Sequence, residues 1–342
     1  MTDILLLVFS GVLCGANDWD EIALFGKEQE SWLRKYGDFH HGIPSHDTIN
    51  RVLNAISSDK FSGCFSRWVT GIRQLQPKEV IAIDGKRICN SYDKSIEQSA
   101  LHMVSAFATQ NGLCLAQKAT NQKSNEITAI PKLLSLLDIE GDIITIDAMG
   151  CQKKIASKIC EQKADYILAV KGNQLSLERE IENTVQLSKP VDDNTQTDCG
   201  HGRIENRRCR VYEDQAYLEN AQEWKSLKSL VVIDSERIIK ARGEVSKQIR
   251  FYISSLNGSA EDFNRWIREH WAIVNNLHWT LDVTFREDYS RKRKGNAAHN
   301  FNIVLKSVLA LLVKDTSWKA SHKRKRLKAA LSEEYRNKLL NF

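Results

Sequence analysis

The stretch Asp142-Ile143-Ile144-Thr145-Ile146-Asp147-Ala148 determines the fold that we expect for this chain. Its four β-branched residues in a row predict a buried strand, because such side chains are stiff and fit a pleated sheet. Helix-like segments on either side indicate a central strand that is covered on both faces. Asp147 then stands at the carboxyl end of the strand, where α/β sheets bind their ligands. From this stretch alone, Asp147 could equally cap the following turn or helix.

The order of the neighbouring segments predicts an α/β fold. A second apolar strand, residues 79–86, carries Asp84-Gly85 near its end, and an Asn-Gly pair at 111–112 between two strand-like runs is a hairpin signal. Helices are expected over 130–137 and 152–163, before and after the 142–148 stretch, and a strand over 166–170. Strand, strand, strand, helix, strand, helix, strand is the topology of an RNase H-like core, a mixed five-stranded sheet with flanking helices. Its first and fourth strands are neighbours, so we expect Asp84 and Asp147 to meet in space.

The remaining segments divide the chain into five expected parts. Residues 1–77 are expected to form a helical N-terminal domain, and 78–175 the first part of the core. An inserted, mostly β subdomain follows over 176–256, helices at 257–315 complete the core, and 316–342 form a basic tail. The Gly/Pro turn at 42–48 between two helices could be a DNA-reading unit, although such pairs more often simply pack.

Charge and cysteine usage narrow the class of protein. Residues 286–338 hold fifteen Lys/Arg and five Asp/Glu, a net +10, so the rest carries −4 of the total +6. Such a tail suggests a polyanionic partner, with a solvated charged helix as the alternative. Eight cysteines without metal-binding spacing predict reduced thiols in a cytosolic protein. The apolar run 4–16 is too short to span a bilayer and lacks a basic leader, so we expect a buried helix and no membrane partner.

Seven short motifs span nearly the whole length of the chain. They are GIPSHDT at 42–48, AIDGK at 82–86, KSNEI at 123–127, TIDAMGCQKKIA at 145–156, DYILAVKGNQ at 165–174, HGRIENR at 201–207, and NLHWTLDVTFRED through RKGNA at 276–297. Together and in this order they resemble the H-repeat-associated family of bacterial insertion-sequence transposases, whose core is the RNase H-like DDE type. The resemblance implies a transposase that binds the ends of its element and performs metal-dependent DNA cleavage and strand transfer.

The resemblance also implies the site residues. Asp84 and Asp147 would be catalytic acids that bind two Mg²⁺ or Mn²⁺ ions, with Asp84 bridging both. Family members are similar around HWxIEN, where the Glu is the third acid, but this chain has Val274 at that position, and a valine cannot bind a metal. Glu287, or Asp288, is the substitute that position suggests.

DNA is the expected partner, and the resemblance alone implies a homodimer on DNA in the bacterial cytoplasm, associated with the nucleoid when bound. The arginines of the inserted subdomain could contact phosphates or form surface salt bridges. The residues that we expect to contact DNA are Lys86, Lys171, Arg203, Arg291, Lys292, Arg293, Lys294, Lys323, Arg324, Lys325 and Arg326. Two alternatives to an active transposase stay open: a catalytically dead DNA-binding remnant, which Val274 favours, and another RNase H-like nuclease.

Overall fold

The computed structural model describes residues 1–92, 100–120, 126–200, 202–241 and 243–341. Within these residues the chain forms one nine-stranded sheet. In chain order its strands are β1 (Val80–Arg87), β2 (His102–Ala108), β3 (Leu113–Ala119), β4 (Ile143–Ile146), β5 (Asp165–Val170), β6 (Asp192–Gly200), β7 (Arg203–Tyr212), β8 (Ser229–Ile239) and β9 (Glu244–Ser254).

The first five strands lie in the spatial order β3-β2-β1-β4-β5. β1 is antiparallel to β2 and parallel to β4, and β4 is parallel to β5. All four residues of β4 are buried, which confirms the predicted central strand. The predicted hairpin is also confirmed, since β2 and β3 are antiparallel and Gly112 between them has φ +68°.

The pairing of β1 with β4 fixes the positions of the two aspartates. Ile83 lies opposite Ile146 in this parallel pair. Asp84 and Asp147 are the residues that follow Ile83 and Ile146 on these two neighbouring parallel strands. Two residues that are 63 positions apart in the sequence therefore lie at the same edge of the sheet.

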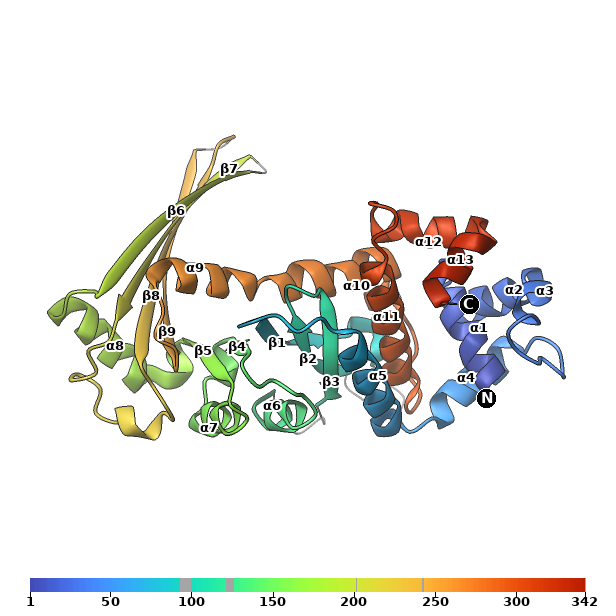
Figure 1. Cartoon of the computed structure of the whole chain (residues 1–342), viewed down its shortest axis with the longest axis horizontal. Helices are drawn as coiled ribbons and strands as arrows, with labels where there is room; N and C mark the ends of the chain where they lie inside the picture. The colour runs from blue at the N-terminus through green and yellow to red at the C-terminus, as the bar shows by residue number, and fades with distance from the viewer. Residues whose placement is uncertain (93–99, 121–125, 201, 242, 342) are drawn as a thin grey trace.

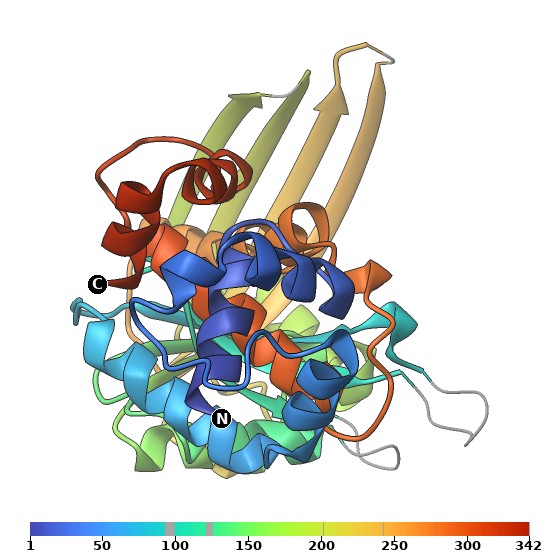
Figure 2. The ribbon, with the colours of Figure 1, turned by 90° about the vertical axis from the view of Figure 1, so that its right-hand side faces the viewer.

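The remaining four strands extend the same sheet. β9 pairs antiparallel with β5, and β8, β7 and β6 follow outward. We expected a five-stranded core sheet and a separate β insertion, whereas the insertion covers the free edge of β5 with hydrogen-bonded strands, which an exposed edge favours. The far ends of the β6–β7 and β8–β9 hairpins project away from the helices (Figures 1 and 2).

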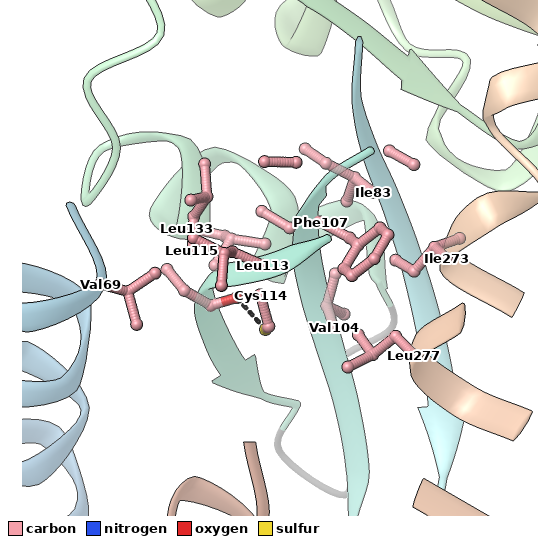
Figure 3. Packing of buried hydrophobic residues seen from close by; sticks show 14 of the residues in the cluster. Val69, Ile83, Val104, Phe107, Leu113, Cys114, Leu115, Leu133, Ile273 and Leu277 are labelled. Atoms are coloured by element: carbon pink, nitrogen blue, oxygen red, sulfur yellow. Dashed lines mark hydrogen bonds between the residues drawn. The ribbon is translucent and has the colours of Figure 1, made fainter. Parts of the chain in front are cut away.

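Helices cover both faces of the central strands (Figure 1). On one face lie α6 (Glu126–Leu134) and α7 (Lys153–Glu161), and on the other α9 (Ala260–Glu269), a π-helical segment (Ile273–His278) and α10 (Trp279–Phe285). Figure 3 shows how Phe107 and Val104 of β2 approach Ile273 and Leu277 of the π segment, while Leu115 of β3 lies beside Leu133 of α6. These apolar contacts fix both layers against the sheet.

The N-terminal and C-terminal helices lie side by side at one end of the sheet (Figures 1 and 2). The Asp18 and Ser45 side chains cap α2 and α4 by accepting hydrogen bonds from the Glu21 and Thr48 amides. Trp32 Nε1 donates a hydrogen bond of 2.8 Å to Asn337 Oδ1 and so joins the two ends of the chain. These helices are α1 (Thr2–Leu13), α2 (Trp19–Glu28), α3 (Glu30–Leu33), α4 (His46–Ala55), α5 (Ser58–Ile72), α12 (His322–Leu331) and α13 (Glu333–Leu340).

Two further helices complete the described chain. α8 (Leu175–Leu187) precedes the strands of the insertion. α11 (Ala297–Lys314) is long and apolar enough to cross a membrane by length and composition alone, but 72% of it is buried inside the protein. Such burial is what the core helix of a folded domain shows.

Candidate metal centre

Asp84 and Asp147 line one cleft of about 440 Å³ at the edge of the sheet. The floor of the cleft comes from β4 and β5, and one wall from the helix that follows β9. Its lining includes Thr145, Lys171, Glu178, Arg250, His270, Trp271 and Val274. The structure thus places both predicted acids and the Val274 position around one space.

The Asp147 side chain has two roles in the structure. It accepts a hydrogen bond of 3.1 Å from the Met149 amide and so caps the short 3₁₀ turn Ala148–Gly150. The same carboxylate faces the cleft. The two interpretations of Asp147, as a cap and as a site residue, are therefore compatible, because a cap uses only part of the carboxylate's acceptor capacity.

Negative charge is concentrated beside the two aspartates. Burial, the charge of Asp147 and the charge of Glu126 together raise the pKa of Asp84 to about 6. Burial and the charge of Glu126 also raise the pKa of Asp147 above its ordinary value. Carboxylates that repel one another in this way are stabilised by a bound cation, since its charge favours their ionised forms.

Glu126, the first residue of α6, reaches the sheet directly beside Asp84. A Cβ atom on Gly85 would lie 2.1 Å from Glu126 Oε1, so this close approach requires a glycine. Glu126 Oε1 also lies 2.6 Å from His102 Nε2 on β2. Of the KSNEI motif, residues 123–125 are outside the described part of the chain, but Glu126 and Ile127 are within it.

Two histidines, the buried His278 and the half-buried His270, contact the same region from the opposite face. His270 Nδ1 lies 2.9 Å from Thr145 Oγ1, and His278 Nδ1 lies 3.5 Å from Asp84 Oδ2. Burial lowers the pKa of His270 to about 4 and that of His278 to about 3. Both imidazoles are therefore neutral near neutral pH.

Val274 belongs to the π-helical segment and lines the cleft with Asp84 and Asp147. π-helical turns are uncommon and occur frequently at functional sites. A carboxylate at this position would face the same space as the two aspartates. The valine offers that space only an apolar surface.

Glu287, the expected substitute, is not among the residues that line the cleft. It is 3% exposed, its Oε2 lies 2.6 Å from Lys86 Nζ, and it accepts a hydrogen bond from Asn302. Asp282, Glu287 and Asp288 form a compact acidic group. The Lys86 ammonium pairs with all three carboxylates, so Lys86 is engaged inside the protein and is not presented to a DNA phosphate.

The other basic residues expected to contact DNA fall into two groups. Lys171, Arg291, Lys294, Lys323 and Arg324 are exposed, and Arg203 and Arg293 are partly exposed. Arg203 pairs with Glu205, and Arg293 donates to the Asn90 carbonyl. Of these exposed basic residues, Lys171 lines the same cleft as Asp147.

Lys292, Lys325 and Arg326 were expected to contact DNA, but their side chains are buried. In this structure they are therefore not available to a DNA phosphate. Lys292 donates to the Asn17 carbonyl and lies over the Trp19 and Phe301 rings. Lys325 donates to the Leu312 carbonyl, and Arg326 to the Val12 carbonyl at 3.0 Å. The Lys325 and Arg326 side chains therefore take the place of water as hydrogen-bond donors to carbonyl groups at the ends of α11 and α1.

Comparisons with known proteins agree with the motifs. A family model described as "Transposase DDE domain" matches residues 75–312, and the "DDE_Tnp_1-associated" model matches residues 1–69. The "H repeat-associated putative transposase YhhI" of Escherichia coli K12 is 44% identical over 344 residues, covering 98% of this chain and 90% of that protein. The "Putative transposase YncI" of Escherichia coli O157:H7 is 46% identical over 346 residues, covering 99% and 89%. A piggyBac transposase synaptic complex with hairpin DNA is similar at a TM-score of 0.48 and 10% identity, covering 100% of this chain and 73% of that one.

Proposed function

The chain belongs to the DDE family of insertion-sequence transposases, which are metal-dependent DNA-cleaving enzymes, and from this premise we propose that Asp84 and Asp147 hold its catalytic metal ions. The observation that carries the proposal is the register of β1 and β4. It makes the two aspartates the next residues after the Ile83–Ile146 pair, at the rim of one cleft. The strand order β3-β2-β1-β4-β5 supports an RNase H-like core within the larger sheet.

The side chains fit divalent cations of the hard, oxygen-preferring type. Asp84 and Asp147 provide carboxylate oxygens to the cleft, and Mg²⁺ needs only a few carboxylates because it keeps several water ligands. We propose that Asp84 and Asp147 together would hold two Mg²⁺ or Mn²⁺ ions. When bound, such ions neutralise the charge that develops on the attacking and leaving oxygens.

The reaction that this site would support is phosphodiester cleavage followed by strand transfer. In cleavage, the oxygen of a water bonds to phosphorus while the bond to the 3′ oxygen breaks, and that oxygen takes a proton to become a free 3′-hydroxyl. In strand transfer, this hydroxyl loses its proton and bonds to a target phosphorus, while the target's own 3′ oxygen leaves. Asp84 and Asp147 would hold the cations that neutralise the reacting phosphate, and Lys171 at the cleft would pair with a neighbouring phosphate.

The wider arrangement is part of the same proposal. The helical part at 1–77 and the exposed basic residues Lys323 and Arg324 would hold DNA outside the core, with the inserted strands at 176–256 beside the cleft. Residues 257–315 would complete the core, and the basic segment 316–342 would follow it. The enzyme would act as a homodimer on two DNA ends in the bacterial cytoplasm, at the nucleoid.

A second candidate function is DNA binding without cleavage. It is favoured by Val274, which stands in the cleft where the family has its third acid. In this case the two aspartates would bind metal too weakly for turnover, while the basic surface would still bind DNA. The two candidates therefore differ in cleavage and agree in DNA binding.

Nicking of supercoiled plasmid by the purified chain in Mn²⁺ separates the candidates. We expect nicking by the wild type that Asp147→Asn abolishes, and faster nicking by Val274→Glu. Nicking that persists in Asp147→Asn would remove Asp147 from the site. Binding that survives in every variant, with no nicking by the wild type and nicking gained in Val274→Glu, would establish the second candidate.

A further inference from the structure

We infer that two copies of this chain associate through β6, with the two β6 strands hydrogen-bonded antiparallel to each other about a two-fold axis. The inference rests on the proposed function in one respect, because it names the surface that the proposed homodimer would use. It involves neither aspartate of the cleft, so association of the chains decides it and DNA cleavage does not.

The two edges of the nine-stranded sheet differ in how they are covered. β3, at one edge, packs against α5, α6 and α11. β6, at the other edge, pairs with β7 alone among the strands that the structure describes, and its hairpin projects away from the helices (Figures 1 and 2). Seven of the nine β6 residues are exposed and the other two are partly exposed. One edge is thus protected by helices and the other is open to a partner.

β6 lacks the features that usually protect an exposed edge strand from another chain. Such edges commonly carry lysine, proline or a β-bulge. The sequence of β6, DDNTQTDCG, contains neither lysine nor proline, and its register with β7 is unbroken over all nine residues. Alternate N–H and C=O groups along the outer side of β6 can therefore bind a further strand.

DNA does not fit the charge of β6. The charged residues of this strand are three aspartates, which repel phosphates. Each aspartate is bound within the chain, in the pairs Asp192 with the Ala260 amide, Asp193 with Arg208, and Asp198 with Arg268. The strand therefore presents its neutral side chains and its outer backbone groups to a partner, and a second polar strand matches both.

The sequence of β6 is complementary to itself when all nine residues of the two strands pair. This register places Gln196 on the two-fold axis, opposite Gln196 of the second copy. Thr195 then lies opposite Thr197 of the second copy, and Asn194 lies opposite Asp198. Both pairs can hydrogen-bond side chain to side chain across the strands. The second copy of this chain is therefore the partner that we assign to β6.

The same register keeps the negative charges of the two copies apart. The three aspartates of each strand lie opposite Gly200, Cys199 and Asn194 of the other. An axis one residue nearer the start of β6 would instead place Asp192 opposite Asp198, and like charges directly opposite each other are destabilising. The register with the longest pairing thus also avoids this repulsion.

Disulfide trapping of the full chain, without DNA or metal, tests the pairing and its register. Opposite residues on antiparallel strands have Cα atoms about 4.5–5.5 Å apart, which a disulfide can span. We expect mild oxidation to convert Gln196→Cys to a covalent dimer about tenfold or more faster than the wild type, because pairing brings the two thiols together. The wild type is the control, because its exposed Cys199 lies about 20 Å from Cys199 of the second copy in this register.

Two charge variants, added to Gln196→Cys, separate pairing of β6 from other causes. Thr195→Lys with Thr197→Lys places lysine opposite lysine, whereas Thr195→Lys with Thr197→Glu places lysine opposite glutamate. Both threonines are exposed, and both variants lose the same hydrogen bond from Thr197 to Asn206. We expect the first variant to slow trapping about tenfold and the second to return it to within about twofold of Gln196→Cys alone. The rate with a small neutral disulfide corrects each variant for the reactivity of its thiol.

Three results would overturn the inference. They are trapping of Gln196→Cys no faster than that of the wild type, equal rates in the two charge variants, and rapid trapping of the wild type through Cys199, which would need another register. Because DNA and metal are absent, none of these results bears on the roles of Asp84 and Asp147. The nicking assay decides those roles separately.

Folding of each variant is checked by circular dichroism. If Gln196→Cys does not fold, sedimentation velocity compares the wild type with the two charge variants made in the native sequence. A dimer that the lysine–lysine variant weakens and the lysine–glutamate variant restores supports the inference. A wild type that stays monomeric at every concentration, or a dimer that both variants leave unchanged, contradicts it.

Discussion

Lys86 Nζ lies 2.6 Å from Glu287 Oε2, and this ion pair joins β1 to the segment that follows α10. Asp282 and Asp288 complete the set of carboxylates around the ammonium group. The pair lies two residues beyond Asp84 on the same strand and on the same face, so it anchors the strand that carries the first aspartate. Lys86 thus supports the site from inside the protein.

Replacing Lys86 should destabilise the fold. Lys86→Met would leave Glu287, which is 3% exposed, without its cation, and breaking such a buried pair costs about 3 kcal/mol. Urea unfolding measures the loss. Lys163→Met is the control, because the side chains of its pair with Glu140 are 74% and 64% exposed, and it should change stability by less than about 1 kcal/mol. Equal stabilities of the two variants would contradict the anchoring role.

Arg326 should matter for stability and Lys323 for DNA binding. Arg326 is 5% exposed and donates to the Val12 and Ala16 carbonyls at the end of α1. We expect Arg326→Ala to cost about 2 kcal/mol or more in unfolding free energy, since it leaves these carbonyls without a charged donor. Lys323→Ala should leave the unfolding curve nearly unchanged. An unfolding free energy of Arg326→Ala that equals that of the wild type would contradict this structural role of Arg326.

The double variant Lys323→Ala, Arg324→Ala should weaken DNA binding evenly across sequences. Both side chains are exposed on α12, and phosphate contacts carry no sequence information. The slope of log affinity against log salt should fall in magnitude by about 1 for each cation that no longer pairs with a phosphate. Fluorescence anisotropy at several salt concentrations measures it. An unchanged slope would mean that DNA does not reach α12.

Stability should fall as the pH drops from 6.5 towards 4, in part through His299. His299 is buried beside Ser62, and burial together with the charge of Lys306 lowers its pKa to about 4. Lys118 also lowers this pKa, and Asp59 opposes both lysines. Because the unfolded chain takes up the proton first, acid favours unfolding over this range, by up to roughly 3 kcal/mol.

The variant His299→Gln checks this assignment. Its unfolding free energy should depend less steeply on pH between 6.5 and 4 than that of the wild type. His46→Gln serves as the control, because the His46 side chain is 52% exposed. An identical pH dependence in His299→Gln and the wild type would show that His299 does not titrate on unfolding.

Local signals predicted the elements that carry the aspartates. The β-branched run at 143–146 forms a buried strand because only a sheet covered on both faces accommodates it, and Asn111-Gly112 forms the expected hairpin. The N-caps at Asp18, Ser45 and Ser259 use Asp and Ser, residue types that N-caps favour. These features depend on a few consecutive residues, and so they can be read without the tertiary structure.

Features that depend on distant contacts could not be predicted in this way. The pairing of β9 with β5 joins segments on either side of the insertion, and no local pattern specifies that edge. The basic run at 323–326 was expected at the surface, but Lys325 and Arg326 find carbonyl partners on other helices of the fold. Glu126 lay in a recognised motif, yet its position beside Gly85 required the packing of α6 on the sheet.

The most direct test of the account is the anomalous scattering from a crystal soaked in Mn²⁺. We expect two peaks in the cleft, within bonding distance of the Asp84 and Asp147 carboxylates. Peaks at Asp282, Glu287 and Asp288, displacing Lys86, together with none at Asp84 and Asp147, would contradict it.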